Sequence, residues 1–213
     1  MATYDLDEQE RLDELKAWWK QWGTLVLIGV AVVVAAAAGW RWWQNHTVTQ
    51  SLEASSVYMK LTQSLTTNDL KGAREAGALL IDQYADTAYA PRAALLLAKL
   101  NAGNKDAKSA QTQLEWAVAN SKEPALKDLA RLRLAGVQFD QKQFDAALKT
   151  LTAAHSEAFA FRFHDLRGDI LLAQGKSAEA RTEFQAAYTK LAETEPYRNI
   201  VELKLDAVGG ARK

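Results

Sequence analysis

Three histidines are the residues of this chain best suited to chemistry, but their spacing matches no known reaction or metal site. They are His46, His155 and His164. None belongs to an H-E-x-x-H motif, and none has a carboxylate or a second histidine at a recurring metal-ligand spacing. The chain also has no cysteine, which excludes disulfide bonds and thiolate chemistry. We interpret His164 as a packed histidine and His46 as a residue that borders a membrane segment.

One pair of carboxylates has the spacing of a general acid and base. Asp165 and Asp169 are four residues apart, so both lie on one face of a helix. Because Arg162 and Arg167 stand beside them, we interpret this group as a solvated or salt-bridged surface. The chain has no G-x-S-x-G, Walker or G-x-G-x-x-G motif. The sequence therefore predicts a non-enzymatic protein without catalytic residues, metal or cofactor. An envelope enzyme with a site assembled from distant residues stays open as an alternative.

The composition favours one helical domain that does not bind nucleic acid. Lysine and arginine number 26, as do aspartate and glutamate, so the formal net charge is zero and no basic field attracts nucleic acid. After about residue 50 the chain is rich in alanine and poor in valine, isoleucine and threonine, which favours helix over strand. Without an N-terminal anchor of about 45 residues, about 165 remain, which is enough for one domain.

An apolar stretch at residues 23–39 organises the chain. Its seventeen residues carry no charge and form about 26 Å of helix, slightly less than a hydrocarbon core of about 30 Å. Six of the seven tryptophans flank it, as in the interfacial belts of membrane proteins. We predict a transmembrane helix at 23–39 with tryptophan belts at 18–22 and 40–43. A buried core helix and a cleaved signal peptide are the alternatives. The belt residues are Trp18, Trp19, Trp22, Trp40, Trp42 and Trp43.

Small residues in this stretch suit contact with other membrane helices, because they let two backbones approach closely. The predicted helix-packing residues are Gly29, Ala31, Ala35, Ala36, Ala37, Ala38 and Gly39.

The charges beside the stretch predict its orientation. Arg11, Lys16 and Lys20 lie on the N-terminal side, whereas only Arg41 is close on the other, so the N-terminus is expected in the cytoplasm. Residues 1–22 are then a cytosolic amphipathic segment, and residues 44–213 form a domain on the other side of the membrane, outside the cytoplasm.

From about residue 44 the pattern is one helix after another. Breaks are expected near Asn68, Pro91, Asn104, Pro124, Gln141, Gly175 and Pro196. Three copies of a small, small, large, small pattern recur at offsets of 37 and 33 residues, close to the 34-residue tetratricopeptide period. Small residues are needed where two helices cross closely. The predicted packing residues are Ala98, Ala110, Leu114 and Ala117; Ala135, Ala147, Leu151 and Ala154; and Gly168, Ala180, Phe184 and Ala187.

Ser64, Ala76 and Leu80 fit a weaker fourth copy of this pattern. The predicted fold is therefore all-α: one transmembrane helix, then an α-solenoid of about four degenerate tetratricopeptide-like hairpins and a terminal helix that covers the open end.

Such a stack offers a concave face, built from the first helix of each hairpin, that suits an extended or helical partner segment. The alternative is an ordinary solvated surface. The predicted groove residues are Arg92, Lys99, Phe139, Arg162, Asp165, Asp169 and Leu172.

Several short stretches resemble the YfgM family of bacterial inner-membrane proteins. They are residues 7–9 (DEQ), the Trp18–Trp19 pair, residues 39–44 (GWRWWQ) and residues 166–181 (LRGDILLAQGKSAEAR). The resemblance covers nearly the whole chain. It implies a single-span protein with a cytosolic N-terminus and a periplasmic repeat domain. It also implies an ancillary role at the SecYEG translocon, beside the membrane-anchored chaperone PpiD. Some members are linked to a cytosolic stress regulator through the N-terminal segment.

We therefore predict a membrane-tethered adaptor that links the secretion translocon to periplasmic chaperones. A self-associating envelope scaffold is the second hypothesis, and an envelope enzyme is the third.

Overall fold

The structure, a computed structural model, describes the backbone of residues 3–209 and the side chains of residues 11–209. The side chains of the first ten residues of the predicted cytosolic segment 1–22 lie outside this description, as do residues 210–213 of the predicted domain. The chain forms two compact units, residues 1–50 and 51–213. All regular structure within the described backbone is α-helical, which confirms the predicted fold class.

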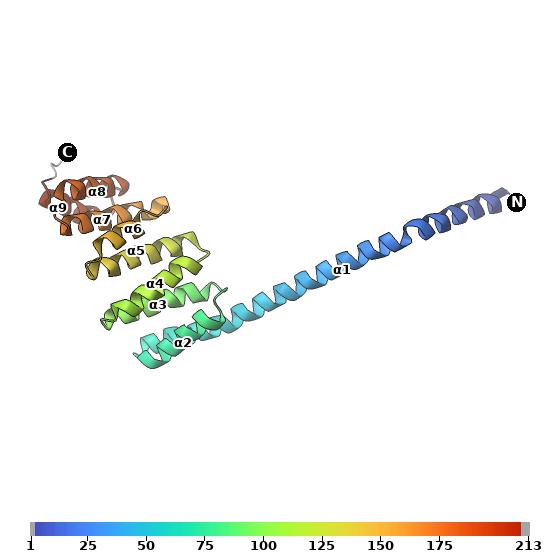
Figure 1. Ribbon diagram of the computed structural model, residues 1–213, viewed down its shortest axis with the longest axis horizontal. Helices are drawn as coiled ribbons and strands as arrows, with labels where there is room; N and C mark the ends of the chain where they lie inside the picture. Colours follow the sequence, from blue (N-terminus) through green and yellow to red (C-terminus); the bar gives the residue numbers. More distant parts are fainter. Residues whose placement is uncertain (1–2, 210–213) are drawn as a thin grey trace. The chain divides into compact units, whose positions relative to one another are not determined.

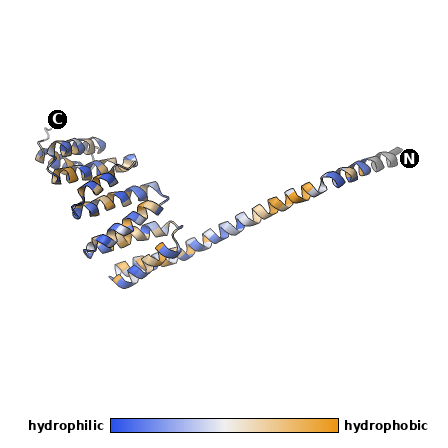
Figure 2. Cartoon of the chain, in the orientation of Figure 1, coloured by the Kyte–Doolittle hydropathy of each residue, from blue (hydrophilic) through white to orange (hydrophobic). Residues whose placement is uncertain are grey.

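Helix α1 is unusually long and runs through the first unit into the second. It spans Thr3–Thr66 and includes a segment long and apolar enough to cross a membrane (Figure 2). The six belt tryptophans are exposed along it, and Trp40 and Trp43 pair at 5.5 Å between ring centroids. A Cβ added at Gly29 or Gly39 would meet no atom within 4 Å, so no other part of the described chain packs on either glycine.

The second unit is a row of antiparallel helix pairs (Figure 1). The C-terminal end of α1 pairs with α2, and their buried residues form one cluster with α3. The pairs α3 and α4, α5 and α6, and α7 and α8 follow, and α9 packs on α8 at the end. The helices are α2 (Leu70–Gln83), α3 (Tyr89–Gly103), α4 (Ala107–Asn120), α5 (Pro124–Asp140), α6 (Phe144–Leu151), α7 (Glu157–Ala173), α8 (Ser177–Lys190) and α9 (Arg198–Ala207).

The turn inside each pair has the same geometry. One residue of each turn is in the left-handed region, with φ between 59° and 79°: Asn68, Lys105, Lys142 and Gly175. The amide of the next residue then donates to the carbonyl five residues earlier, at 2.8–2.9 Å in all four turns. This bond satisfies a carbonyl that the ending helix leaves free. These four residues, 37, 37 and 33 positions apart, therefore define the repeat.

Close helix crossings in the core match a small residue to a large one. A Cβ added at Gly168 in α7 would collide with the ring of Phe184 in α8, which is fully buried. The structure also buries the other predicted packing residues, with one exception. Ala154 is exposed, because α6 ends at Leu151 and the chain leaves the helix before reaching it. Its assignment to the packing set is wrong.

The first pair differs from the predicted register. Ala73, Gly77 and Leu80 are the buried residues of α2, whereas Ala76 is only half-buried. Gly77 stands where the later pairs have a large residue, and a Cβ there would lie 2.6 Å from Leu97 of α3. The fourth copy therefore exists, but it is offset by 37 residues from the second pair rather than by 34.

Two breaks between helices also differ from the prediction. The loop before α3 covers residues 84–88, and Pro91 lies in the first turn of the helix, where a missing amide costs nothing. The loop at residues 152–156 was not predicted, because it contains neither glycine nor proline.

Replacing Gly168 with alanine should destabilise the domain by about 1–3 kcal/mol, because the buried Phe184 ring cannot yield. Thermal unfolding of the full chain in detergent, followed by circular dichroism, measures the effect. Gly136→Ala is the matched control: it lies in α5 with no atom within 4 Å of an added Cβ. It should leave stability equal or raise it by about 0.5–1 kcal/mol. Equal melting temperatures for Gly168→Ala and Gly136→Ala would contradict the close crossing.

Candidate partner-binding face

The first helices of the later pairs, α3, α5 and α7, share one outward face, here called the A face. Residues of the three helices are called equivalent when they precede the left-handed residue of their own turn, Lys105, Lys142 or Gly175, by the same number of positions. Arg92 and Arg162 are equivalent at thirteen residues back, Lys99 and Asp169 at six, and Phe139 and Leu172 at three. The predicted groove residues therefore fall on recurring positions of these helices.

A cavity of about 370 Å³ lies on the A face between α5, α7 and the segment that precedes α9. Three of the predicted groove residues, Arg162, Asp165 and Asp169, line it together. The other lining residues are Leu132, Phe161, Leu166 and Tyr197. The cavity thus combines apolar and charged lining residues, which suits a protruding side chain of a bound segment.

The two carboxylates of this cavity are bound by the terminal helix. Lys204 of α9 donates to Asp165 Oδ1 at 2.8 Å and to Asp169 Oδ2 at 2.7 Å. The hydroxyl of Tyr197 donates to Asp165 Oδ2 at 2.8 Å. The salt-bridged interpretation of the acid pair was therefore correct, but the cation comes from α9. The nearby arginines act elsewhere: Arg167 pairs with Glu183 at 3.0 Å, and Arg162 lies over Phe161.

Burial and the ammonium that two carboxylates share together determine the pKa values of this cluster. Burial raises the pKa of Asp169 and outweighs the bond to Lys204. Burial lowers the pKa of Lys204, but the two carboxylates outweigh it and hold this pKa above 10.5. Burial, followed by the hydrogen bond to Asp165, raises the pKa of Tyr197 above its ordinary value. The cluster is therefore held together by a protonated Lys204 and a neutral Tyr197.

The remaining predicted groove residues lie apart from this cavity. Lys99 is exposed on α3 and Leu172 is exposed on α7. Phe139 is half-buried and packs on Phe144 of α6 at 5.9 Å between ring centroids, so it belongs to the core between these helices. Arg92 donates to Glu123 at 2.6 Å and also to the carbonyl of Ala88. The structure therefore groups three of the seven residues and separates the other four.

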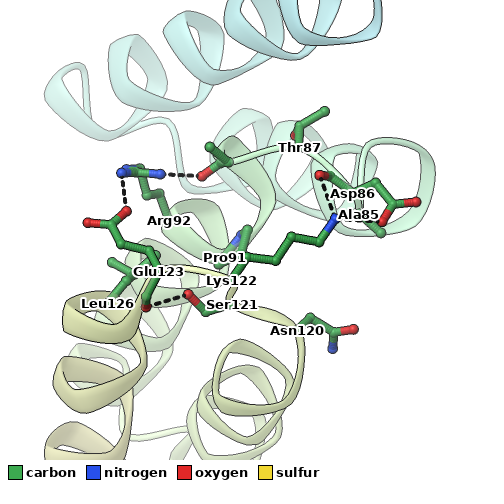
Figure 3. Close-up of a pocket in the computed structure, with 11 residues that line it drawn as sticks. Ala85, Asp86, Thr87, Pro91, Arg92, Asn120, Ser121, Lys122, Glu123 and Leu126 are labelled. Atoms are coloured by element: carbon green, nitrogen blue, oxygen red, sulfur yellow. Dashed lines mark hydrogen bonds and ion pairs between the residues drawn. The ribbon is translucent and has the colours of Figure 1, made fainter. Parts of the chain in front are cut away.

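Arg92 lines a second pocket, of about 240 Å³, between the loops before α3 and α5 (Figure 3). Its charged groups bond to one another across the two loops. Arg92 pairs with Glu123, and Lys122 pairs with Asp86 at 3.2 Å. We interpret this pocket as part of the contact between neighbouring helix pairs rather than as a ligand site.

Asp128 is a buried polar residue that the sequence interpretation missed. Its carboxylate accepts from the amide and hydroxyl of Ser156 at 2.9 and 3.0 Å and from Arg131 at 3.3 Å. Arg131 also donates to the carbonyl of Ala154 at 2.9 Å. These bonds fix the unpredicted loop at 152–156. The signal was an acid at a position where the equivalent residues of α3 and α7, Pro91 and Phe161, are apolar.

The histidines take part in packing and hydrogen bonds. His164 Nδ1 lies 2.7 Å from Glu183 Oε2, and both side chains are largely buried. His155 stacks on Phe163 with 4.2 Å between ring centroids, and His46 stacks on Trp42. Among the side chains of residues 11–209, no group of three histidines or carboxylates is placed to hold a metal ion.

Comparison with known proteins identifies the family. Residues 16–210 match the family model of a tetratricopeptide repeat-like domain. Three relatives carry the name ancillary SecYEG translocon subunit. The Haemophilus influenzae protein is 33% identical over 87% of this chain and 90% of its own length. The Escherichia coli protein is 31% identical over 87% and 89%. The Neisseria gonorrhoeae protein is 28% identical over 98% and 100%.

The chain therefore belongs to the YfgM family of ancillary SecYEG translocon subunits, as its sequence suggested. Family and fold together indicate a non-enzymatic accessory subunit with a single apolar N-terminal helix.

The attachment of α9 should weaken at high pH. Lys204 and Tyr197 both have raised pKa values in the folded state, so the stability they contribute is complete below about pH 10 and falls as pH rises through these values. The melting temperature of the full chain, measured from pH 8 to pH 11, should drop above about pH 10.

Lys204→Met should lower the melting temperature at neutral pH, because Asp165 is left buried without its cation; the cost is about 2 kcal/mol. It should also flatten part of the alkaline decline. Lys149→Met, at an exposed lysine of α6, is the matched control and should follow the wild type. A Lys204→Met profile parallel to the wild-type profile would contradict this account.

Proposed function

We propose that this chain is a membrane-tethered adaptor of the SecYEG protein-secretion translocon and that its repeat domain links the translocon to periplasmic chaperones. The observation that supports it most is the match along nearly the whole chain to relatives named for this translocon. The two-unit architecture agrees with such a role. One unit is an apolar helix with exposed tryptophans, and the other is a helical stack of the kind that binds polypeptides.

In this proposal residues 1–22 are cytosolic, residues 23–39 span the membrane and residues 44–213 form the periplasmic domain. The excess of cations before the span supports this orientation. A membrane-anchored chaperone of the PpiD type is the proposed partner of the periplasmic domain. The acidic segment 1–22 is the proposed contact for a cytosolic regulator.

The span itself contributes to docking in this proposal. The small residues Ala35–Ala38 and Gly39 are exposed on α1, with room around Gly39 for a second helix. Without a hydrophobic driving force between helices in lipid, such close packing is a main source of affinity.

Orientation is tested with reporters fused after residue 213. Alkaline phosphatase, which is active only outside the cytoplasm, should be active in this position. A fluorescent protein that folds only in the cytoplasm should stay dark when it is exported in its place. The reverse result would place the repeat domain in the cytosol and remove the proposed link to periplasmic chaperones.

Translocon association is tested by crosslinking in intact membranes. The full chain with a C-terminal affinity tag should recover SecY, SecE and SecG together with a membrane-anchored chaperone. Recovery of none of these proteins would count against the adaptor role.

Replacing Ala35–Ala38 with leucines should keep insertion but reduce translocon recovery, by about fivefold or more, because the larger side chains prevent close helix packing. Replacing the four valines at positions 30 and 32–34 with leucine is the matched control, since it changes side-chain volume much less. Equal recovery for both variants would mean that the span anchors the protein but does not contribute to translocon binding.

A further inference from the structure

Beyond a general adaptor role, we propose that the A face binds an acidic polypeptide segment that carries apolar residues between its carboxylates. This inference rests on the proposed function, since it specifies the kind of segment that the adaptor holds.

Three exposed cations on the A face carry the proposal. Lys99 lies on α3, Arg133 on α5 and Arg162 on α7, one in each successive helix pair. None of the three forms an ion pair with any side chain of residues 11–209. Arg162 rests on the ring of Phe161, with its guanidinium carbon 5.1 Å from the ring centroid. Their charges are thus available to a partner.

The three cations share one surface. Counted back from the turns, Arg133 is equivalent to Leu166 and Lys99 is equivalent to Asp169. Leu166 and Asp169 both line the cavity on the A face, and Arg162 lines it as well. Because α3 packs beside α5 and α5 beside α7, the cations form a row across the stack.

The acids of the same face compensate this charge only in part. Lys204 of α9 holds both Asp165 and Asp169, so neither is free to pair with the row. Asp140 is the remaining acid of this face on α5, and it lies at the turn end of the helix. Lys204 cancels one of the two charges of this pair, so the three cations still exceed the remaining charge of the pair and that of Asp140. The A face therefore keeps a small positive excess, although the formal net charge of the chain is zero.

The cavity adds an apolar requirement. Leu132, Phe161 and Leu166 are its apolar lining residues, and its volume of about 370 Å³ accommodates a large apolar side chain. A ligand with carboxylates alone would leave these apolar residues in water. A segment that alternates acids with apolar residues satisfies both the row and the cavity.

The repeat spacing also sets the spacing of the ligand. Neighbouring helices pack about 10 Å apart. A chain in the polyproline II conformation advances about 3.1 Å per residue and returns to the same face at every third residue. A carboxylate at about every third position would therefore meet successive cations.

The test uses the full chain in detergent and a fluorescent peptide of about five Glu-Leu-Ser units, with binding followed by anisotropy. The Glu-Leu-Ser peptide should bind, and binding should weaken as salt rises to about 0.5 M. A Lys-Leu-Ser peptide of equal length should not bind. Reversing the row in the variant Lys99→Glu/Arg133→Glu/Arg162→Glu should weaken binding about tenfold or more.

A second triple variant controls for net charge. Lys108→Glu/Lys149→Glu/Arg181→Glu changes three exposed cations on the second helices, α4, α6 and α8, and should bind the acidic peptide like the wild type. Asp140→Asn removes the opposing charge from the A face and should tighten binding. Circular dichroism of each variant verifies that the helices are intact.

The outcomes separate this inference from the proposed function. Loss of peptide binding in the A-face variant alone, with SecYEG recovery unchanged, supports the acidic-segment site. Equal weakening in both triple variants, binding of the basic peptide, or no binding of the acidic peptide would overturn it. The adaptor role survives any of these results as long as the wild-type chain still recovers SecYEG from membranes.

Discussion

The repeat domain depends on one steric constraint. Packed helices must cross closely enough that no cavity remains between them. The structure meets it by matching sizes at each crossing. Gly168 accepts the ring of Phe184, and in the first pair Gly77 accepts the side chain of Leu97 from the next helix. Protein interiors pack as densely as organic crystals, so the position of the small residue and that of the large side chain depend on each other to within a few tenths of an ångström. The order of small and large residues can differ between pairs while the constraint stays the same.

Because the order of small and large residues can differ between pairs, the sequence predicted the register of the later pairs but not that of the first. The later pairs follow one size pattern, so all of their packing residues predicted from spacing are buried except Ala154. In the first pair the large residue Leu61 and the small residue Gly77 exchange places, and a size pattern then gives the wrong offset. The true register is set by the left-handed turn residue. Breaks near all four turns were predicted, but Lys105 and Lys142 are unusual residues for that conformation, so the residue that sets the register could not be identified from its type.

The parts of the candidate site that sequence reasoning missed are all long-range. The acid pair Asp165 and Asp169 was found from its spacing, but its cation comes from Lys204, more than thirty residues later. The early end of α6 at Leu151 was missed for the same reason. Its end is fixed by Asp128 and Arg131 of another helix, and the loop has no glycine or proline to mark it. Local patterns report which residues share a helix face; they do not report which distant helix covers that face.

Capping and recognition are therefore linked in this domain. A terminal helix is required because an uncovered last pair would expose apolar surface to water. Here that helix also places one ammonium between two carboxylates of the A face, and so cancels one of their two negative charges. If the stack ended without α9, the acids would lie beside Arg162 and cancel it. The helix that closes the core thus also sets the sign of the surface that faces a partner. Its attachment, through groups that titrate only at high pH, keeps that sign constant at neutral pH.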